Sequence, residues 1–285
     1  MQKLKLLFQK TISLEEKMFI WWRFLFGAYF IYYAVRTIPY LEEIYGREGI
    51  VPDISLNWTY GIFPNLFSFI STEQLPLLLH LGIIVSALFL LFGYFPRAAA
   101  FIIWFLQTTL YNRNVLTGEP SLAFVGLLLL TLTLIPNQPS LLRKREYREM
   151  EVPYFVFFLP VFIFCLTFTV SAIDKSMSSS WLSGKALMQM LNMGIIKDNF
   201  IVHFFISQPA LVSAFSYLAV LVQFSCFPLM VLGFYRMALI LNFLAFLCIF
   251  YLIDINQVIY GMLFFYSFFL LDVSFLRKIK QRLFS

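Results

Sequence analysis

The sequence has little charge. Only 13% of its 285 residues are charged, whereas 61% are apolar, and the mean hydropathy is +0.82. Soluble domains carry about a quarter charged residues, because these residues coat the surface that faces water. A deficit of this size excludes an ordinary soluble domain and predicts that a lipid bilayer covers most of the exterior.

Histidine and cysteine are also scarce. The chain has two histidines and three cysteines, with no HExxH or CxxC pattern. We therefore expect no metal site, which needs several ligand residues, and no thiol–disulfide relay, which needs a closely spaced pair of cysteines. His80 and His203 are expected to be structural histidines. Cys165, Cys226 and Cys248 lie in apolar stretches, where single thiols behave as small apolar residues.

Apolar segments of helical length follow one another along the chain. Crossing a bilayer takes about 20 helical residues. Ser13-Leu14-Glu15-Glu16 reads as a capping box before the first of these segments. The sequence therefore predicts an all-α integral membrane protein with about eight transmembrane helices, placed at 17–38, 74–94, 97–111, 120–136, 153–173, 209–233, 236–252 and 255–272.

Basic residues mark one side of the predicted bundle. They gather in the N-terminal segment 3–17, the middle loop 143–148 and the tail 277–282, and an even number of predicted spans separates these groups. The positive-inside rule makes this side cytoplasmic, so both termini are expected in the cytoplasm of a multi-pass protein of the cell (inner) membrane. Anionic lipid accounts for the net charge of +6, so no nucleic-acid partner is expected.

An internal repeat is expected at an offset of 139 or 140 residues. It pairs Gly93 with Gly233, Arg97 with Arg236, and Arg36 with Lys175. Four spans in each copy predict two parallel four-helix repeats within a single membrane domain. The predicted parts are the first repeat at 1–136, a basic cytoplasmic linker at 137–152, the second repeat at 153–276 and a basic tail at 277–285.

Each copy has a long stretch between its first and second spans, at 39–72 and 176–208. These stretches are expected to form amphipathic helices in the outer interface. Two interpretations stay open, because such helices can either roof a cavity or only pack on the ends of the spans.

Polar residues in or at the ends of apolar spans are costly in hydrocarbon unless they face protein or water. On the predicted topology many of them meet on the outer side, and we interpret them as one polar pocket. The alternative is that each pairs separately at the interface. The candidate residues are Arg36, Asn112, Arg113, Asn114, Glu119, Asp174, Lys175 and Asp254.

Several segments carry a resemblance to a known family. They are Tyr45-Gly46-Arg47-Glu48-Gly49-Ile50-Val51-Pro52, then Tyr111-Asn112-Arg113-Asn114, then Ser171-Ala172-Ile173-Asp174-Lys175 followed by Trp181-Leu182-Ser183-Gly184-Lys185-Ala186-Leu187. In this order and spacing they resemble the HTTM domain, a family that includes the membrane part of vitamin K-dependent γ-glutamyl carboxylase.

The resemblance implies a catalytic role for Lys175, because it stands where the carboxylase keeps the lysine that deprotonates a hydroquinone. A neutral amine can act as a general base there, and burial favours the neutral form. The other polar candidates, together with Trp181, would hold the substrate. No counterpart of the carboxylase's large soluble region follows Ser285, so γ-carboxylation itself is not expected.

Three functions stay open from the sequence. The first is a quinone- or lipid-linked membrane enzyme that works on the outer face with Lys175 as base. The second is a non-catalytic partner or maturation factor for a secreted peptide, similar to the membrane component of the sporulation-delaying system. The third is a small-molecule transporter, which is less favoured because the charged residues gather toward one face and not at the midplane.

Overall fold

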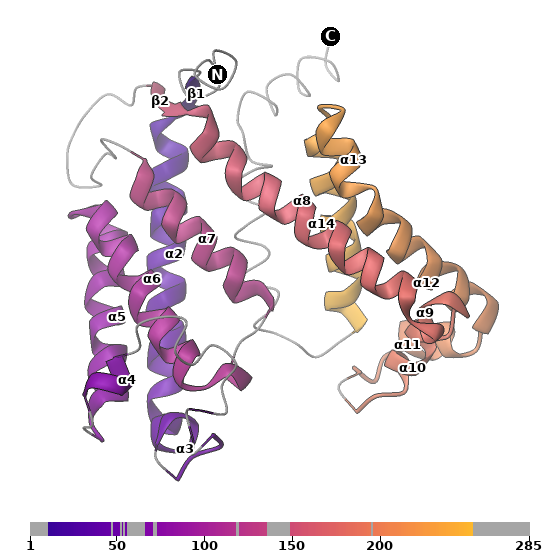
Figure 1. The fold of residues 1–285 in the computed structure, drawn as a ribbon, viewed down its shortest axis with the longest axis horizontal. Helices are drawn as coiled ribbons and strands as arrows, with labels where there is room; N and C mark the ends of the chain where they lie inside the picture. Colours follow the sequence, from indigo (N-terminus) through magenta and orange to yellow (C-terminus); the bar gives the residue numbers. More distant parts are fainter. Residues whose placement is uncertain are drawn as a thin grey trace. The chain divides into compact units, whose positions relative to one another are not determined.

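The computed structural model consists almost entirely of helices (Figure 1). It describes residues 11–46, 48–51, 53, 55, 66–70, 73–117, 120–135, 149–194 and 196–252. The chain divides into two compact units, Met1–Phe157 and Phe158–Ser285.

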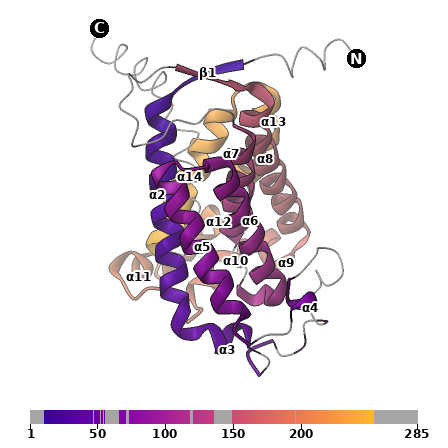
Figure 2. The same cartoon turned by 90° about the vertical axis from the view of Figure 1, so that its left-hand side faces the viewer.

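The longer helices described in the first unit are α2 (Glu16–Thr37), α5 (Leu75–Phe92), α6 (Pro96–Arg113) and α7 (Pro120–Leu134). They pack in chain order, with α5 between α2 and α6 (Figure 2). Phe26, Phe30, Ile83 and Ile103 are fully buried between them. A Cβ atom at Gly27 would lie 2.7 Å from the Ala87 carbonyl oxygen, so this glycine lets α2 and α5 approach closely.

Short elements cover one end of this bundle. The 3-10 helix η1 (Ile38–Tyr40) and helix α3 (Leu41–Tyr45) follow α2, and α4 (Leu66–Phe69) precedes α5. Helix α3 packs on α5, and α4 packs on α6, near the end where α6 runs into the 3-10 helix η3 (Val115–Thr117). In Figure 2, α3 and α4 lie at the same end of the unit.

The first unit also contains a two-stranded antiparallel ladder, which the sequence analysis did not predict. Strand β1 (Thr11–Glu15) pairs with β2 (Glu149–Pro153), with Thr11 opposite Pro153. The capping-box prediction is therefore wrong. An N-cap residue stands directly before the first helical turn, whereas Ser13 lies within β1 and α2 begins at Glu16.

The second unit is built on α8 (Tyr154–Met177), α12 (Pro209–Phe224), α13 (Cys226–Val231) and α14 (Tyr235–Leu252). Both α12 and α13 pack against α14. Aromatic contacts attach α8 to α13 and α14, through Phe162 with Phe227 and Phe168 with Phe246. The short helices α9 (Ser179–Leu182), α10 (Ala186–Leu191) and α11 (Phe200–Ile206) gather at one end of α12 (Figure 1).

The predicted sixth span, 209–233, corresponds to the candidate span Pro209–Val231, which has a local irregularity at Ser225. Helix α12 ends at Phe224 and α13 begins at Cys226. Pro228 explains the break, because a proline ring clashes with the carbonyl four residues earlier, which here belongs to Phe224. Ser225 bridges the two helices, since its amide donates to the Leu221 carbonyl and its own carbonyl accepts from the Leu229 amide.

Among the described residues, three helical segments are long and apolar enough to cross a membrane: Leu75–Phe92, Tyr154–Met177 and Pro209–Val231. Two shorter apolar helices are Leu122–Leu134 and Tyr235–Cys248. The helical class and the presence of candidate membrane spans are thus confirmed. The number of eight spans stays a prediction, and the eighth, 255–272, lies outside the described residues.

Two glycines that the predicted repeat pairs adopt the same turn. Gly93 ends α5 with a φ of 77°, and Gly233 follows α13 with a φ of 84°. At the first turn the amides of Gly93 and Tyr94 donate to the carbonyls of Leu90 and Phe89. At the second turn those of Gly233 and Phe234 donate to Met230 and Leu229. Both are Schellman caps, which favour glycine because of its positive φ.

Candidate functional site

Arg113 is a buried side chain at the C-terminal end of α6, with 5% of its surface exposed. Its two terminal nitrogens each donate to a backbone carbonyl, at 2.5 Å to Val51 and 2.5 Å to Gly46. Its guanidinium also lies 5.9 Å from the centre of the Phe67 ring. Arg113 therefore fastens the chain after α3 to the end of α6.

Asn114 continues the same attachment. Its side-chain amide donates to the Ile44 carbonyl at 2.8 Å, and its side-chain oxygen accepts from the Leu116 amide at 3.0 Å. We call Arg113, Asn114 and the carbonyls of Ile44, Gly46 and Val51 the loop clamp. The clamp joins two of the segments that carry the family resemblance, and its contacts are those that hold a fold together. Substrate binding by Arg113 and Asn114 stays a prediction.

Lys175 lies in the last turn of α8, half-buried. Its amine donates to the Ser171 hydroxyl oxygen at 2.5 Å, one helical turn earlier. The amine nitrogen also lies 5.5 Å from the centre of the Trp181 ring. The structure thus brings two of the predicted site residues, Lys175 and Trp181, together. We call Ser171, Lys175 and Trp181 the lysine site.

A tight turn holds Trp181 in this position. Gly184 follows α9 with a φ of 68°, and a Cβ atom there would lie 3.0 Å from the Ser213 Cβ atom. On α12, the Ser216 hydroxyl lies 3.2 Å from the Gly184 carbonyl oxygen, and the Tyr217 hydroxyl donates to the Leu182 carbonyl at 3.0 Å. The segment that resembles the carboxylase around its lysine is therefore fixed on α12.

Asp174 and Arg36 occupy more open positions. Asp174 is exposed next to Lys175 in the sequence. Arg36 is exposed at the end of α2, and its guanidinium donates to the Tyr32 hydroxyl at 3.2 Å. Lys175 and Arg36, which the predicted repeat pairs, thus each bond to a hydroxyl four residues earlier in their own helix.

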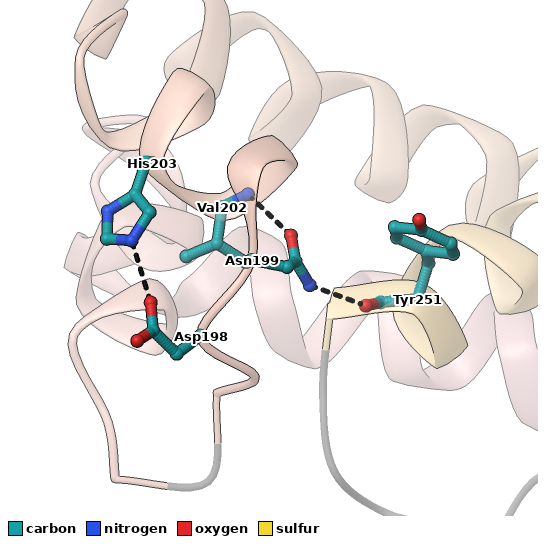
Figure 3. Close-up of polar contacts among 5 residues, drawn as sticks. All are labelled: Asp198, Asn199, Val202, His203 and Tyr251. Atoms are coloured by element: carbon teal, nitrogen blue, oxygen red, sulfur yellow. Dashed lines mark hydrogen bonds and ion pairs between the residues drawn. The ribbon is translucent and has the colours of Figure 1, made fainter.

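A polar cluster connects α11 to the end of α14 (Figure 3). Asn199 caps α11 by accepting from the Val202 amide at 3.0 Å, and its amide donates to the Tyr251 carbonyl at 3.3 Å. The His203 ring nitrogen lies 2.7 Å from an Asp198 carboxylate oxygen, and both side chains are exposed. The cluster satisfies backbone groups at two helix ends, so it holds the segment between α10 and α11.

The first unit contains buried polar contacts that the sequence analysis missed. The Tyr45 hydroxyl makes hydrogen bonds with the side chains of Thr117 and Tyr33, and burial raises the Tyr45 pKa so that the phenol stays neutral. The Gln107 amide donates to the Tyr33 hydroxyl at 3.4 Å. These residues are far apart in the sequence. The sequence feature that could have indicated the contacts is Gln107, a glutamine within an apolar span.

The predicted pocket draws residues from both units. Arg36, Asn112, Arg113 and Asn114 belong to the first unit, whereas Asp174, Lys175 and Trp181 belong to the second. Asn112 is buried at the end of α6. Glu119 and Asp254 lie outside the described residues. A single pocket formed by all of them stays a prediction.

Comparison with known proteins gives no match to a family model, a curated protein or a solved structure.

Proposed function

We propose that this chain is a multi-pass membrane protein of the HTTM type, with about eight spans arranged as two parallel four-helix repeats and both termini in the cytoplasm. Three candidate spans, two shorter apolar helices and the sidedness of the basic residues support this topology. The repeat is supported by the matched Schellman caps at Gly93 and Gly233 and by the matched contacts of Arg36 and Lys175.

Its proposed activity is that of a membrane enzyme of the outer face that removes a proton from a quinol or a related lipid-linked substrate, with Lys175 as the base. The observation that carries this proposal is the lysine site. The amine is half-buried between a hydroxyl and an indole ring. Among the described residues no carboxylate lies within ion-pair distance of it, and the only carboxylate shown to act on it is that of Asp174, which is exposed. A lysine held for structure usually has such a partner when it is withdrawn from water.

The three side chains suit this chemistry. A planar ring can stack on the Trp181 indole next to the amine. The Ser171 hydroxyl directs the amine, because its oxygen accepts a hydrogen bond from Nζ at 2.5 Å. In the neutral state Nζ keeps a lone pair, with which it accepts the substrate's hydroxyl proton and becomes an ammonium. A hydroquinone would supply that acidic hydroxyl group.

The loop clamp has a different role in this proposal. Arg113 and Asn114 use their side-chain donors on backbone carbonyls. We assign them to holding the predicted outer segment after α3. Substrate contacts are proposed for Arg36, Asn112, Asp174 and Trp181, and for Glu119 and Asp254 outside the described residues.

The test is quinol oxidation by the purified chain in lipid nanodiscs. A reduced short-chain quinone is added under oxygen. The deprotonated quinol gives two electrons to dioxygen, which yields quinone and hydrogen peroxide, and the rise of quinone absorbance is followed. Lys175→Met and Lys175→Arg should both lose the acceleration over empty nanodiscs. Arginine keeps the positive charge and the stacking on Trp181 but does not release its proton. The arginine variant therefore distinguishes a Lys175 that acts as a base from a Lys175 that acts only as a structural cation.

Lys185→Arg serves as the matched control, because Lys185 is exposed in the same unit. It should oxidise quinol at the wild-type rate. Full activity of Lys175→Arg would refute the proposal that Lys175 acts as the base. If a secreted peptide co-purified with that variant as with the wild type, the alternative of a peptide maturation factor would replace the enzyme.

A further inference from the structure

His80 presents a buried hydrogen-bond acceptor inside the first unit. Its side chain is fully buried in α5, and Nδ1 lies 2.8 Å from the Pro76 carbonyl oxygen. A carbonyl oxygen only accepts hydrogen bonds, so Nδ1 carries the proton and Nε2 of the neutral ring is an acceptor. Among the described residues, no donor reaches Nε2.

Gln107 on α6 presents a second such acceptor. Its amide nitrogen donates to the Tyr33 hydroxyl at 3.4 Å, which leaves the side-chain oxygen Oε1 to accept. That oxygen is buried, and within the described part of the chain it has no donor either. Buried acceptors are normally paired, because an unpaired one has lost its bonds to water without replacement.

Tyr45 connects the two residues. Its ring centre lies 5.8 Å from that of His80, and its hydroxyl makes a hydrogen bond with Tyr33, the partner of Gln107. His80 lies five residues after the start of α5, and Gln107 lies six residues before the end of the neighbouring antiparallel helix α6. At 1.5 Å per residue, both are about 8–9 Å from the same end of the unit.

The groups that contact His80, Gln107 and Tyr45 through hydrogen bonds are neutral. Tyr33, Tyr45, Gln107 and Thr117 contribute hydroxyl and amide groups, and the His80 ring donates one hydrogen bond to a carbonyl. A bound cation would be poorly compensated there, because a buried charge needs an opposite charge or several strong dipoles. The arrangement favours a neutral donor.

We propose that His80 Nε2 and Gln107 Oε1 form an internal binding site for a small neutral molecule that donates two hydrogen bonds. Water is the smallest member of this class, and a small organic molecule with two O–H or N–H donors is the other. The site lies under α3, which the loop clamp holds in place, and it is independent of the lysine site.

The test uses the small number of histidines. The chain has only His80 and His203, so histidine labelled with ¹⁵N in the ring gives signals from two imidazole rings, with an Nδ1 and an Nε2 signal for each, by solid-state NMR of the full chain in lipid. His203→Gln assigns them. The Nε2 signal of His80 should be shifted upfield from that of an unbonded imidazole nitrogen, and Gln107→Met should move it.

Gln223→Met provides the matched control. Gln223 also has a buried side-chain oxygen without a donor among the described residues, but it lies in the second unit. This substitution should leave the His80 signal unchanged. A wild-type Nε2 signal typical of an unbonded nitrogen, or one that Gln107→Met does not move, would overturn the proposal.

Two further measurements identify the donor. Magnetisation transfer from water to His80 Nε2 would show that water occupies the site. A small molecule in the organic extract of the wild type, absent from that of Gln107→Met, would show an organic donor. A hydrogen-bonded Nε2 with neither result means that the donor belongs to the protein itself, and this outcome refutes the proposal.

Discussion

Replacing Arg113 by methionine should destabilise the first unit. The change removes two hydrogen bonds from a charged donor, to Gly46 and Val51. Such bonds contribute about 1.5–3 kcal/mol each. The smaller side chain also removes a buried charge, which offsets part of the loss. We therefore expect a net destabilisation of about 3 kcal/mol, concentrated where α3 joins the following loop.

Hydrogen exchange measured by mass spectrometry in lipid nanodiscs checks this prediction at the level of the segment. Amides at 44–51 should exchange on the order of 100-fold faster in Arg113→Met, since 1.4 kcal/mol corresponds to a factor of ten and local opening releases part of the total. Peptides from α12 in the second unit should keep their wild-type rates.

Arg97→Met is the matched control. Arg97 is exposed, and it makes one hydrogen bond, from Nε to the Thr133 carbonyl at 2.8 Å. Because this bond is exposed to water, its loss should change stability by less than about 1 kcal/mol. If both arginine variants exchanged at equal rates at 44–51, the clamp would not hold this segment and our reasoning on Arg113 would be refuted.

Three more substitutions test the turns and caps. Gly184→Ala should lower the free energy of unfolding by about 2 kcal/mol, because alanine is strained at a φ of 68° and its Cβ atom would crowd α12. Its stability is measured by thermal unfolding beside that of Gly194→Ala. No atom lies within 4 Å of a Cβ atom at Gly194, so that change should have a small effect. A Cβ atom at Gly233 would also have open space around it, but Gly233 has a φ of 84°. Gly233→Ala should therefore lower the free energy of unfolding by about 1 kcal/mol, and wild-type stability would contradict the role of Gly233 as a helix cap. Asn199→Ala should lower the free energy of unfolding by about 1 kcal/mol and speed hydrogen exchange at the Val202 amide. Unchanged exchange at that amide would contradict the role of Asn199 as the N-cap of α11.

Helix positions could be read from the sequence to within a few residues. The predicted spans 74–94 and 120–136 correspond to α5 (Leu75–Phe92) and α7 (Pro120–Leu134). Long apolar runs bounded by proline and glycine determine such helices locally. Pro228 is visible in the sequence too, but the irregularity that it causes at Ser225 was not predicted. Hydrophobicity alone does not show whether an apolar segment forms one continuous helix.

Contacts between distant segments were beyond the sequence. The ladder of β1 with β2 joins residues more than 130 positions apart, and no local pattern announces it. The same holds for Arg113, whose partners are backbone carbonyls at Gly46 and Val51 and thus carry no side-chain signature. Lys175 and Trp181 were easier to associate, because they lie within two helical turns of each other.

Protection of Lys175 by a quinol tests the proposed function most directly. The chain in nanodiscs is treated with an amine-reactive acylating reagent, with and without a saturating hydroquinone analogue, and the modification of each lysine is measured by peptide mass spectrometry. Lys175 labelling should fall several-fold when the analogue is present, whereas labelling of the exposed Lys185 should stay constant. Unchanged labelling of Lys175, or an equal fall at both lysines, would contradict a quinol site at the end of α8.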